Sequence, residues 1–311
     1  MLPKSKEARF EIINQCQFNC RICLKNSLTR PIAMMNYSLF TYLVDKMIKE
    51  TNQYEAISFA GIGEPLINHS LPSMINYCTK KKLKTLVVTN GDLLTADKFI
   101  ELQDAGLYSV RVSFHGTNPN DYSKLHGVPQ SLFVKVRDQL DRILNLKNRT
   151  TKVLLTHVVM KGVNEAPLET WIKLFGDKPD SVEVLSAHNW SNSLPNRNCD
   201  VEKMDTCGRI FDGPLQVQAD GTINSCCFDW DGKLTFGDFK YQTLKQIFSS
   251  KEYTQVALAH QTGMFTDEDM ICTKCDQRNK DKNEALLYSS SFEDKEERIK
   301  MTSTNYDRIK K

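Results

Sequence analysis

Short apolar runs alternate with longer amphipathic runs over the first two thirds of the chain, and this alternation restricts the fold more than any other feature. The runs rich in β-branched and aromatic residues cover 8–14, 55–61, 84–90, 108–114, 152–159 and 181–186. Helical patterns lie between them, over 39–50, 70–82, 95–105, 130–146 and 165–175. This order predicts an α/β fold with a parallel sheet and helices outside it. Since a closed barrel has eight strands, we expect a partial (β/α)6 TIM-like barrel with its chemistry at the C-terminal ends of the strands.

The pattern changes near residue 190, where the polar stretch AHNWSNSLPNRNCD is typical of a connection between domains. We predict a core domain over 1–200, a small cysteine-rich domain over 201–280 and a charged tail over 281–311. Within the small domain, PLQVQ and TINSC flank an Asp-Gly pair, which predicts a hairpin.

Composition narrows the location and the partners. No run approaches the roughly 18 apolar residues of a membrane helix, and the first residues lack the layout of a secretory signal, so we expect a cytoplasmic protein without a membrane partner. A net charge of +3, from 41 basic and 38 acidic residues, does not favour nucleic-acid binding. Ten cysteines are many for a reducing compartment, where clustered cysteines usually bind metal or act in catalysis.

Three of these cysteines, Cys16, Cys20 and Cys23, form a Cx3Cx2C run directly after the first predicted strand. Three thiolates on one short loop can hold three irons of a [4Fe-4S] cube and leave the fourth iron open to a chelating cofactor. Zinc is the alternative, but structural zinc sites usually close four ligands from two paired hooks, and no fourth ligand lies nearby in sequence.

This motif, its place after the first strand and the apolar Ile22 within it resemble the radical S-adenosylmethionine (SAM) superfamily. The resemblance implies that Cys16, Cys20 and Cys23 hold a [4Fe-4S] cluster whose open iron binds SAM, with Ile22 near the adenine.

The segment Gly61-Ile62-Gly63-Glu64-Pro65 is similar to the GGEP motif of the same family, which binds the methionine amino group, although Ile62 replaces a family glycine. Small residues let the backbone approach a ligand closely. By the same resemblance, polar residues at later strand ends contact SAM or face the substrate: Asn90, Ser113, His115 and His157. We assign Gly61, Gly63, Glu64, Asn90 and Ser113 to SAM.

The second cysteine group resembles the Cx9-15Gx4C signature of the twitch and SPASM extensions, through Cys207, Gly221 and Cys226, followed by Cys272 and Cys275. The resemblance implies one auxiliary [4Fe-4S] cluster closed by Cys207, Cys226, Cys272 and Cys275, in a shortened, twitch-like version of a SPASM domain. Four thiolates also suit tetrahedral zinc, which stays an alternative. Cys227 neighbours Cys226, and successive strand residues face opposite sides, so Cys227 either packs locally, donates hydrogen to a substrate radical or replaces Cys226 as the ligand.

The resemblance implies an enzyme that cleaves SAM reductively to a 5'-deoxyadenosyl radical, with a flavodoxin- or ferredoxin-type electron donor. The first hypothesis is a two-electron oxidation of a small molecule, because the auxiliary cluster can accept an electron, and because GEPLI and TNGDLLT are similar to a radical SAM dehydrogenase that acts on an aminocyclitol. The second is epimerisation or crosslinking of a short peptide, with Cys227 as hydrogen donor in the epimerase. The third is a non-catalytic zinc protein. We expect His188, Asn189 and Trp190 to line the substrate pocket.

Overall fold

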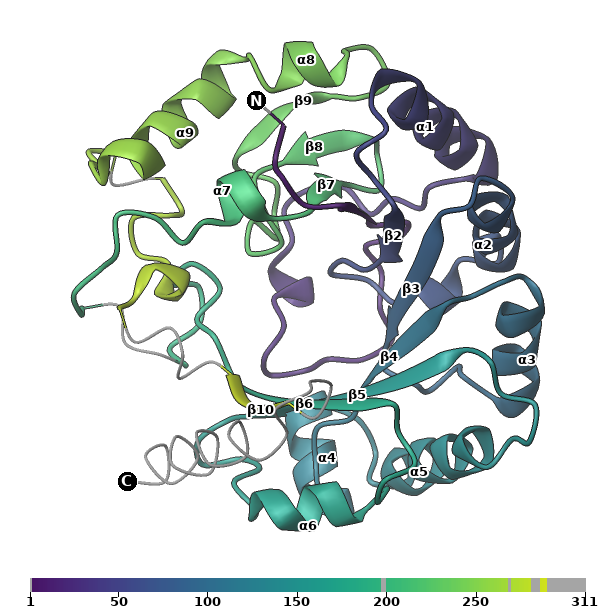
Figure 1. Ribbon diagram of the computed structural model, residues 1–311. Helices are drawn as coiled ribbons and strands as arrows, with labels where there is room; N and C mark the ends of the chain where they lie inside the picture. The colour runs from purple at the N-terminus through teal and green to yellow at the C-terminus, as the bar shows by residue number, and fades with distance from the viewer. Residues whose placement is uncertain (1, 197–199, 268–269, 281–285, 290–311) are drawn as a thin grey trace. The chain divides into compact units, whose positions relative to one another are not determined.

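The computed structural model describes residues 2–196, 200–267, 270–280 and 286–289 (Figure 1). The chain divides into two compact units. The first unit contains Met1–Cys16, Leu24–Leu86 and Asn189–Lys282, and the second contains Gln17–Cys23, Val87–His188 and Asn283–Lys311. The predicted charged tail over 281–311 lies outside the described residues, apart from strand β10 (Leu286–Ser289).

The sheet of the first unit joins the N-terminal strand to strands from the C-terminal part of the chain. Strand β1 (Glu7–Phe10) pairs in parallel with β2 (Ala56–Phe59) on one side and with β7 (Leu215–Val217) on the other. Strand β8 (Thr222–Asn224) then pairs antiparallel with both β7 and β9 (Thr235–Asp238), as Figure 1 shows. The predicted hairpin is therefore confirmed, and it extends the sheet that β1 and β2 begin.

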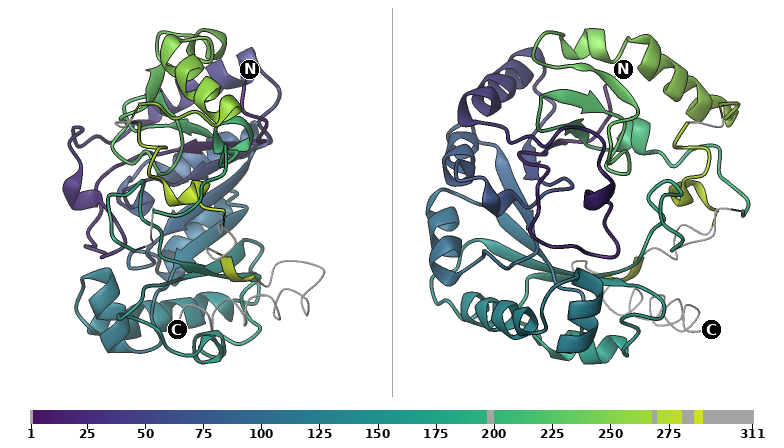
Figure 2. Two further views of the ribbon diagram at one scale, coloured as in Figure 1. Left: turned by 90° about the vertical axis from the view of Figure 1, so that its left-hand side faces the viewer. Right: turned by 180° about the vertical axis from the view of Figure 1, so that it is seen from behind.

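Helices α1 (Tyr37–Glu50) and α2 (Leu71–Lys80) follow β1 and β2, respectively, along the chain. The Phe40 ring of α1 lies 5.3 Å from the Phe10 ring of β1 and 5.6 Å from the Phe59 ring of β2. Because strand side chains alternate between the two faces, Arg9, between the buried Ala8 and Phe10, points to the other face. Helix α7 (Arg209–Asp212) precedes the hairpin, and α8 (Leu244–Ile247) and α9 (Lys251–Thr262) pack against β9 (Figure 2).

The second unit contains three parallel strands, β4 (Ser109–Ser113), β5 (Lys152–Val159) and β6 (Ser181–Ser186), with β10 antiparallel to β6. Its helices are α3 (Ala96–Asp104), α4 (Pro119–His126), α5 (Ser131–Leu144) and α6 (Leu168–Lys173). Strand β3 (Lys84–Thr89) crosses the boundary between the units. Phe114 is central to the core here, with ring centroids of Tyr122, Phe133 and Phe175 at 5.0, 5.4 and 5.2 Å.

The structure corrects the length of the first strand and adds one helix. The first strand ends at Phe10 rather than at residue 14, since Asn14 instead bonds outside the sheet: its amide donates to the Pro31 carbonyl and accepts from the Ala33 N–H. Helix α4 was not predicted, because its eight residues are too few to show helical periodicity. None of the described helices has the length and apolar character needed to cross a membrane.

Candidate active site

The Gly61–Glu64 loop lies against the end of β1 and the residues just before Cys16. A Cβ atom at Gly61 would lie 2.5 Å from the Glu11 Cγ, and one at Gly63 would lie 2.2 Å from the Ile13 carbonyl oxygen. The Glu64 N–H donates to the Gln15 carbonyl at 2.9 Å. Both positions therefore require glycine because another part of the chain approaches so closely.

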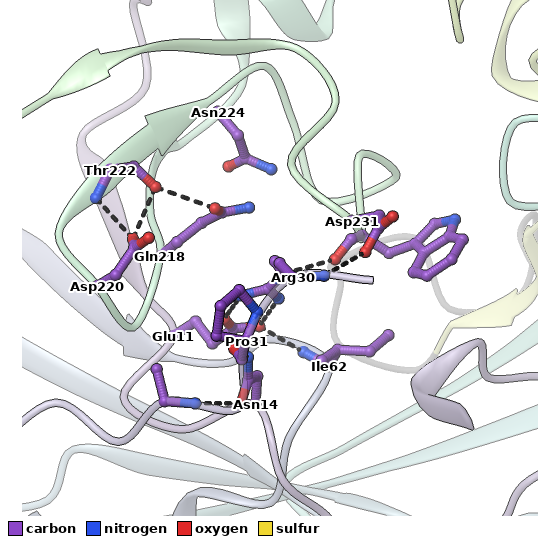
Figure 3. Close-up of polar contacts among 12 residues, drawn as sticks. Glu11, Asn14, Arg30, Pro31, Ile62, Gln218, Asp220, Thr222, Asn224 and Asp231 are labelled. Atoms are coloured by element: carbon purple, nitrogen blue, oxygen red, sulfur yellow. Dashed lines mark hydrogen bonds and ion pairs between the residues drawn. The ribbon is translucent and has the colours of Figure 1, made fainter. Parts of the chain in front are cut away.

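A buried ion pair connects this loop with the segment that follows the cysteine triad (Figure 3). The Glu11 carboxylate accepts hydrogen bonds from Arg30 Nη1 and Nη2, at 2.6 and 2.8 Å, and from the Ile62 N–H at 3.0 Å. Arg30 Nε donates to the Trp230 carbonyl at 3.1 Å, and the Asp231 carboxylate accepts from the Thr29 N–H and hydroxyl at 2.7 and 2.6 Å. The segment after Cys23 is thus held both to β1 and to the chain after Cys227. The sequence offers no local signal for this network, since its members lie far apart along the chain.

The C-terminal end of α4 supports the loop that carries Cys20. The Asn19 and Arg21 N–H groups donate to the His126 and Leu125 carbonyls at 3.2 and 2.8 Å. Gly127, with φ of 63°, comes so close that a Cβ there would lie 2.3 Å from the Asn19 carbonyl oxygen. Sequence analysis missed this support together with α4 itself.

Asn90 also lies beside this loop. Its side chain is 8% exposed, and its Oδ1 accepts from Gln17 Nε2 at 3.4 Å. Ser113 is at the end of β4, in register with Thr156 of β5, and Ile22 is half-buried in the loop. Asn90 and Ser113 are two of the residues assigned to SAM. A hydrogen bond links Asn90 to the loop that carries Cys20, whereas the sheet register places Ser113 beside Thr156.

Three buried histidines lie in the second unit, and one of them, His126, contacts the loop that carries Cys20. The ring centroids of His115 and His126 are 4.9 Å apart with parallel planes, and His157 stacks on Trp171 at 5.0 Å. Burial lowers the pKa of His126 to about 3 and that of His157 to about 4, and it holds the pKa of His115 well below its usual range. All three rings are therefore neutral near pH 7.

The thiols of the second cysteine group are close enough to influence one another. Burial raises the pKa of the Cys226 thiol well above its usual value, and the nearby Cys227, Cys272 and Cys275 thiols raise it further. Part of the Cys226 surface nevertheless faces a cavity. Burial and then Cys275 and Cys207 raise the pKa of Cys272, and burial raises the pKa of Cys275 to about 11. Within the part of the chain that the structure describes, no three His, Cys, Asp or Glu side chains form a site for a single metal ion.

A cavity of about 130 Å³ lies in the first unit, between the two motifs. Gly61 and Ile62 border one part of it, and Cys226 and Cys227 another. Other lining residues bring aromatic, amide and charged groups: Trp190, Trp230, Gln216, Gln218, Asn224, Arg9, Glu11 and Arg30. Trp190, which was expected to line the substrate pocket, is one of the residues that line this cavity.

The prediction for Asn189 is wrong. It is fully buried, and its backbone N–H and side-chain Oδ1 bond the carboxylate and N–H of Asp276, each at 3.2 Å. Asn189 therefore holds the segment next to Cys275.

Cys226 and Cys227 have different neighbours. Cys226 lies near Cys272 and Cys275, whereas Arg209 Nη1 is 3.9 Å from the Cys227 Sγ. Burial lowers the pKa of Arg9, but the nearby Cys227 and Glu7 raise it by more, so it is raised overall. Two guanidinium groups therefore face Cys227 in the first unit.

Comparison with known proteins decides the family. The model of the radical SAM superfamily matches residues 10–175, which is more than half of the chain, and the model of the SPASM iron–sulfur cluster-binding domain matches residues 207–276. The chain belongs to the radical SAM superfamily. It is a radical SAM enzyme whose cofactors are a [4Fe-4S] cluster with SAM and a SPASM auxiliary cluster.

Relatives of this radical SAM enzyme differ in what they act on. The probable GTP 3',8-cyclase of Pyrobaculum aerophilum is 27% identical over 165 residues, 51% of this chain and 49% of that protein, so the chain spans about half the length of the curated relatives it matches. The structure of BtrN with AdoMet and 2-DOIA has a TM-score of 0.59 at 18% identity and covers 89% of this chain and 94% of BtrN. Streptococcus suis SuiB with the precursor peptide SuiA has a TM-score of 0.65 at 12% identity, covering 89% and 70%. The predicted fold is confirmed: a partial barrel of six parallel strands and a small antiparallel domain.

Arg278 provides an independent check of whether the second cysteine group of this radical SAM enzyme fits an iron–sulfur cluster. Arg278 is 6% exposed as a residue. Its guanidinium lies 3.4 Å from the Phe265 ring centre and donates to the Cys272 and Met204 carbonyls at 3.2 and 3.1 Å. Burial lowers the pKa of Arg278. The nearby Cys272, Cys207 and Cys275 thiols raise it in part, each by more than Asp205 does. A buried cation is costly unless negative charge lies nearby, and a metal deprotonates its thiol ligands. The four thiols and Arg278 therefore fit an anionic cluster.

Proposed function

We propose that this radical SAM enzyme catalyses a two-electron oxidation of a small-molecule substrate, which leaves two hydrogens lighter. The observation that carries the proposal is the 130 Å³ cavity, because the Gly61–Ile62 backbone and Cys226 border the same space. A substrate bound there would contact both the predicted SAM motif and the predicted auxiliary-cluster motif.

The proposal assigns the ligands as follows. Cys16, Cys20 and Cys23 hold the SAM-binding cluster, and Cys207, Cys226, Cys272 and Cys275 close the auxiliary cluster. The backbone of Gly61, Gly63 and Glu64, together with Ile22, Asn90 and Ser113, binds SAM. The position of Cys226 among buried thiols supports Cys226 over Cys227 as the ligand.

The cavity itself limits the substrate. An apolar cavity of about 150 Å³ holds a benzene molecule, so a space of about 130 Å³ suits one small ring or one side chain. Side-chain amides both donate and accept hydrogen bonds, and three of them line the wall with two indoles: Gln216, Gln218, Asn224, Trp190 and Trp230. These groups can orient a polar molecule of that size and keep bulk water away from its reacting C–H bond.

When bound, the cofactors supply reductive cleavage of SAM, hydrogen abstraction by the resulting 5'-deoxyadenosyl radical and, in the auxiliary cluster, an electron acceptor. The substrate would lose one hydrogen atom to the 5'-deoxyadenosyl radical, which becomes 5'-deoxyadenosine. It would then lose one electron to the auxiliary cluster and one proton to solvent, so it would be oxidised by two electrons overall. A flavodoxin- or ferredoxin-type protein would deliver the electron that SAM cleavage consumes.

The test is an anaerobic incubation of the reconstituted enzyme with SAM, dithionite and a panel of small polar ring compounds, analysed by mass spectrometry. The proposal expects one equivalent of SAM consumed for each product two mass units lighter, as calculated for the loss of two hydrogens. A product of unchanged mass would contradict it.

Peptide epimerisation is a second candidate, and Cys227 is the observation that favours it. Its thiol borders the same cavity, where it can return hydrogen to a substrate radical, and Arg209 lies 3.9 Å from its sulfur. The related SuiB structure contains a precursor peptide, which makes a peptide segment a reasonable ligand for this chain.

The variant Cys227→Ala separates the two candidates. In an epimerase it would still cleave SAM but would form no deuterium-labelled epimer in D₂O, whereas in a dehydrogenase it would retain the oxidised product. Cys78→Ala is the matched thiol control, since Cys78 is fully buried in α2.

The predicted division into 1–200, 201–280 and 281–311 is part of this proposal, and the two family matches support the first two segments by falling inside them.

A further inference from the structure

His126, the last residue of α4, is tightly enclosed. The residue is 1% exposed. Its ring centroid lies 4.2 Å from that of Tyr122, 4.9 Å from that of His115 and 5.5 Å from that of Phe18. Contacts on several sides leave the imidazole little freedom to rotate.

The hydrogen bonds of His126 determine which ring nitrogen carries the hydrogen. The backbone N–H of His115 donates to Nε2 at 3.2 Å, so Nε2 is an acceptor and carries no hydrogen. A neutral imidazole has one N–H, which must then be on Nδ1. Nδ1 lies 3.4 Å from the Cys20 sulfur, within the range of an N–H···S hydrogen bond.

We propose that His126 is a positioning residue that donates an N–H···S hydrogen bond to Cys20 and thereby raises the reduction potential of the SAM-binding cluster. This inference rests on the proposed function, in which Cys20 is a ligand of that cluster. Hydrogen bonds to cluster sulfurs stabilise the reduced, more negative state, and groups behind the ligands commonly orient them and tune the metal.

The surroundings fix the donor and the acceptor relative to each other. The Asn19 N–H donates to the His126 carbonyl, and the Arg21 N–H donates to the carbonyl of Leu125. The residues on both sides of Cys20 are thus bonded to the same helix end that presents the imidazole. Gly127 permits this approach because any side chain there would collide with Asn19. A preorganised donor of this kind does not need to move when the cluster takes up an electron.

The test uses the full reconstituted enzyme and follows the EPR signal that changes when SAM is added, which identifies the SAM-binding cluster. His126→Phe keeps the ring packing and removes the donor, while His126→Asn places a side-chain N–H at the same number of bonds from Cα as Nδ1. His157→Phe is the control, because His157 lies in the same histidine group and bonds the Phe114 carbonyl instead of a cysteine.

We expect the midpoint potential of the SAM-responsive signal to become more negative in His126→Phe, and to return towards the wild-type value in His126→Asn. His157→Phe should keep the wild-type potential. Pulsed EPR after exchange into D₂O should detect a deuteron coupled to the wild-type cluster that is lost in His126→Phe.

A SAM-responsive wild-type signal without that coupling, or a His126→Phe enzyme with both the wild-type potential and the coupling, would overturn the inference while leaving the proposed ligands intact. A wild-type signal that does not respond to SAM would overturn the Cys20 assignment and the inference with it. If His126→Phe assembles no cluster, the deuterium measurement on the wild-type enzyme decides.

Discussion

Removing the Arg30 guanidinium should destabilise the protein far more than removing a surface cation. The Glu11 and Arg30 side chains are 8% and 15% exposed, and Arg30→Gln would leave the Glu11 carboxylate with the Ile62 N–H but without its two charged donors. Breaking a buried ion pair by removing one partner costs about 3 to 5 kcal/mol. The residual exposure of Arg30 places the expected cost at the lower end, about 3 kcal/mol.

Urea denaturation of the cluster-free protein, followed by circular dichroism, measures this cost. At about 2 °C per kcal/mol for a chain of this size, a loss of about 3 kcal/mol also lowers the melting temperature by roughly 6 °C. Lys98→Gln is the matched control: its partner Glu101 is half-exposed, so the loss should stay below about 0.5 kcal/mol. The double variant Glu11→Gln/Arg30→Gln should cost at least about 1 kcal/mol less than the sum of the single variants. An Arg30→Gln cost below about 1 kcal/mol, or strict additivity, would refute the reasoning.

Three further predictions concern other parts of the structure. Gly63→Ala should weaken SAM binding at least about tenfold, or about 1.4 kcal/mol by calorimetry on the reconstituted enzyme, because its Cβ would collide with the Ile13 carbonyl; unchanged affinity would contradict the close approach. The cluster-free protein should lose stability as pH falls from 6.5 to about 4, because His157 takes up a proton in the unfolded chain but stays neutral while it is buried in the folded protein. In urea titrations, His157→Phe should remove up to roughly 3 kcal/mol of this loss, and an unchanged dependence of stability on pH would contradict the prediction. Arg278→Gln should lower the iron retained in the auxiliary cluster while Arg278→Lys retains more, as measured by iron analysis; equal retention in both variants would show that the buried charge is not needed.

The sequence was most informative where structure depends on local periodicity. The predicted strands over 152–159 and 181–186 coincide with β5 and β6, since both segments are rich in β-branched and other apolar residues. The Asp-Gly pair predicted the β7–β8 hairpin because Gly221, with φ of 90°, suits a backbone conformation that other residues rarely adopt. The first strand was predicted too long, because Ile12 and Ile13 are buried as strand residues would be, yet they lie in an irregular segment.

In the candidate site, too, local features could be predicted from the sequence and long-range contacts could not. The first cysteine group and the Gly61–Glu64 motif could be recognised because each lies within one short segment, and the second cysteine group because its spacing resembles a known signature. Glu11 and Arg30, or Cys20 and His126, are brought together only by the folded chain, so no window of sequence contains the interaction. The pair Cys226 and Cys227 was ambiguous for the same reason, since only the folded chain brings Cys272 and Cys275 near Cys226 and guanidinium groups near Cys227.

The central claim is that Cys16, Cys20 and Cys23 hold the cluster that cleaves SAM. The most direct test is anaerobic reconstitution with iron and sulfide, addition of SAM and dithionite, and detection of 5'-deoxyadenosine by mass spectrometry. The triple variant Cys16→Ala/Cys20→Ala/Cys23→Ala is measured beside the wild-type enzyme. We predict 5'-deoxyadenosine from the wild-type enzyme and none from the variant, which should keep the iron of its auxiliary cluster. Equal 5'-deoxyadenosine from both proteins, or a wild-type protein that takes up zinc in place of iron and makes none, would contradict the account.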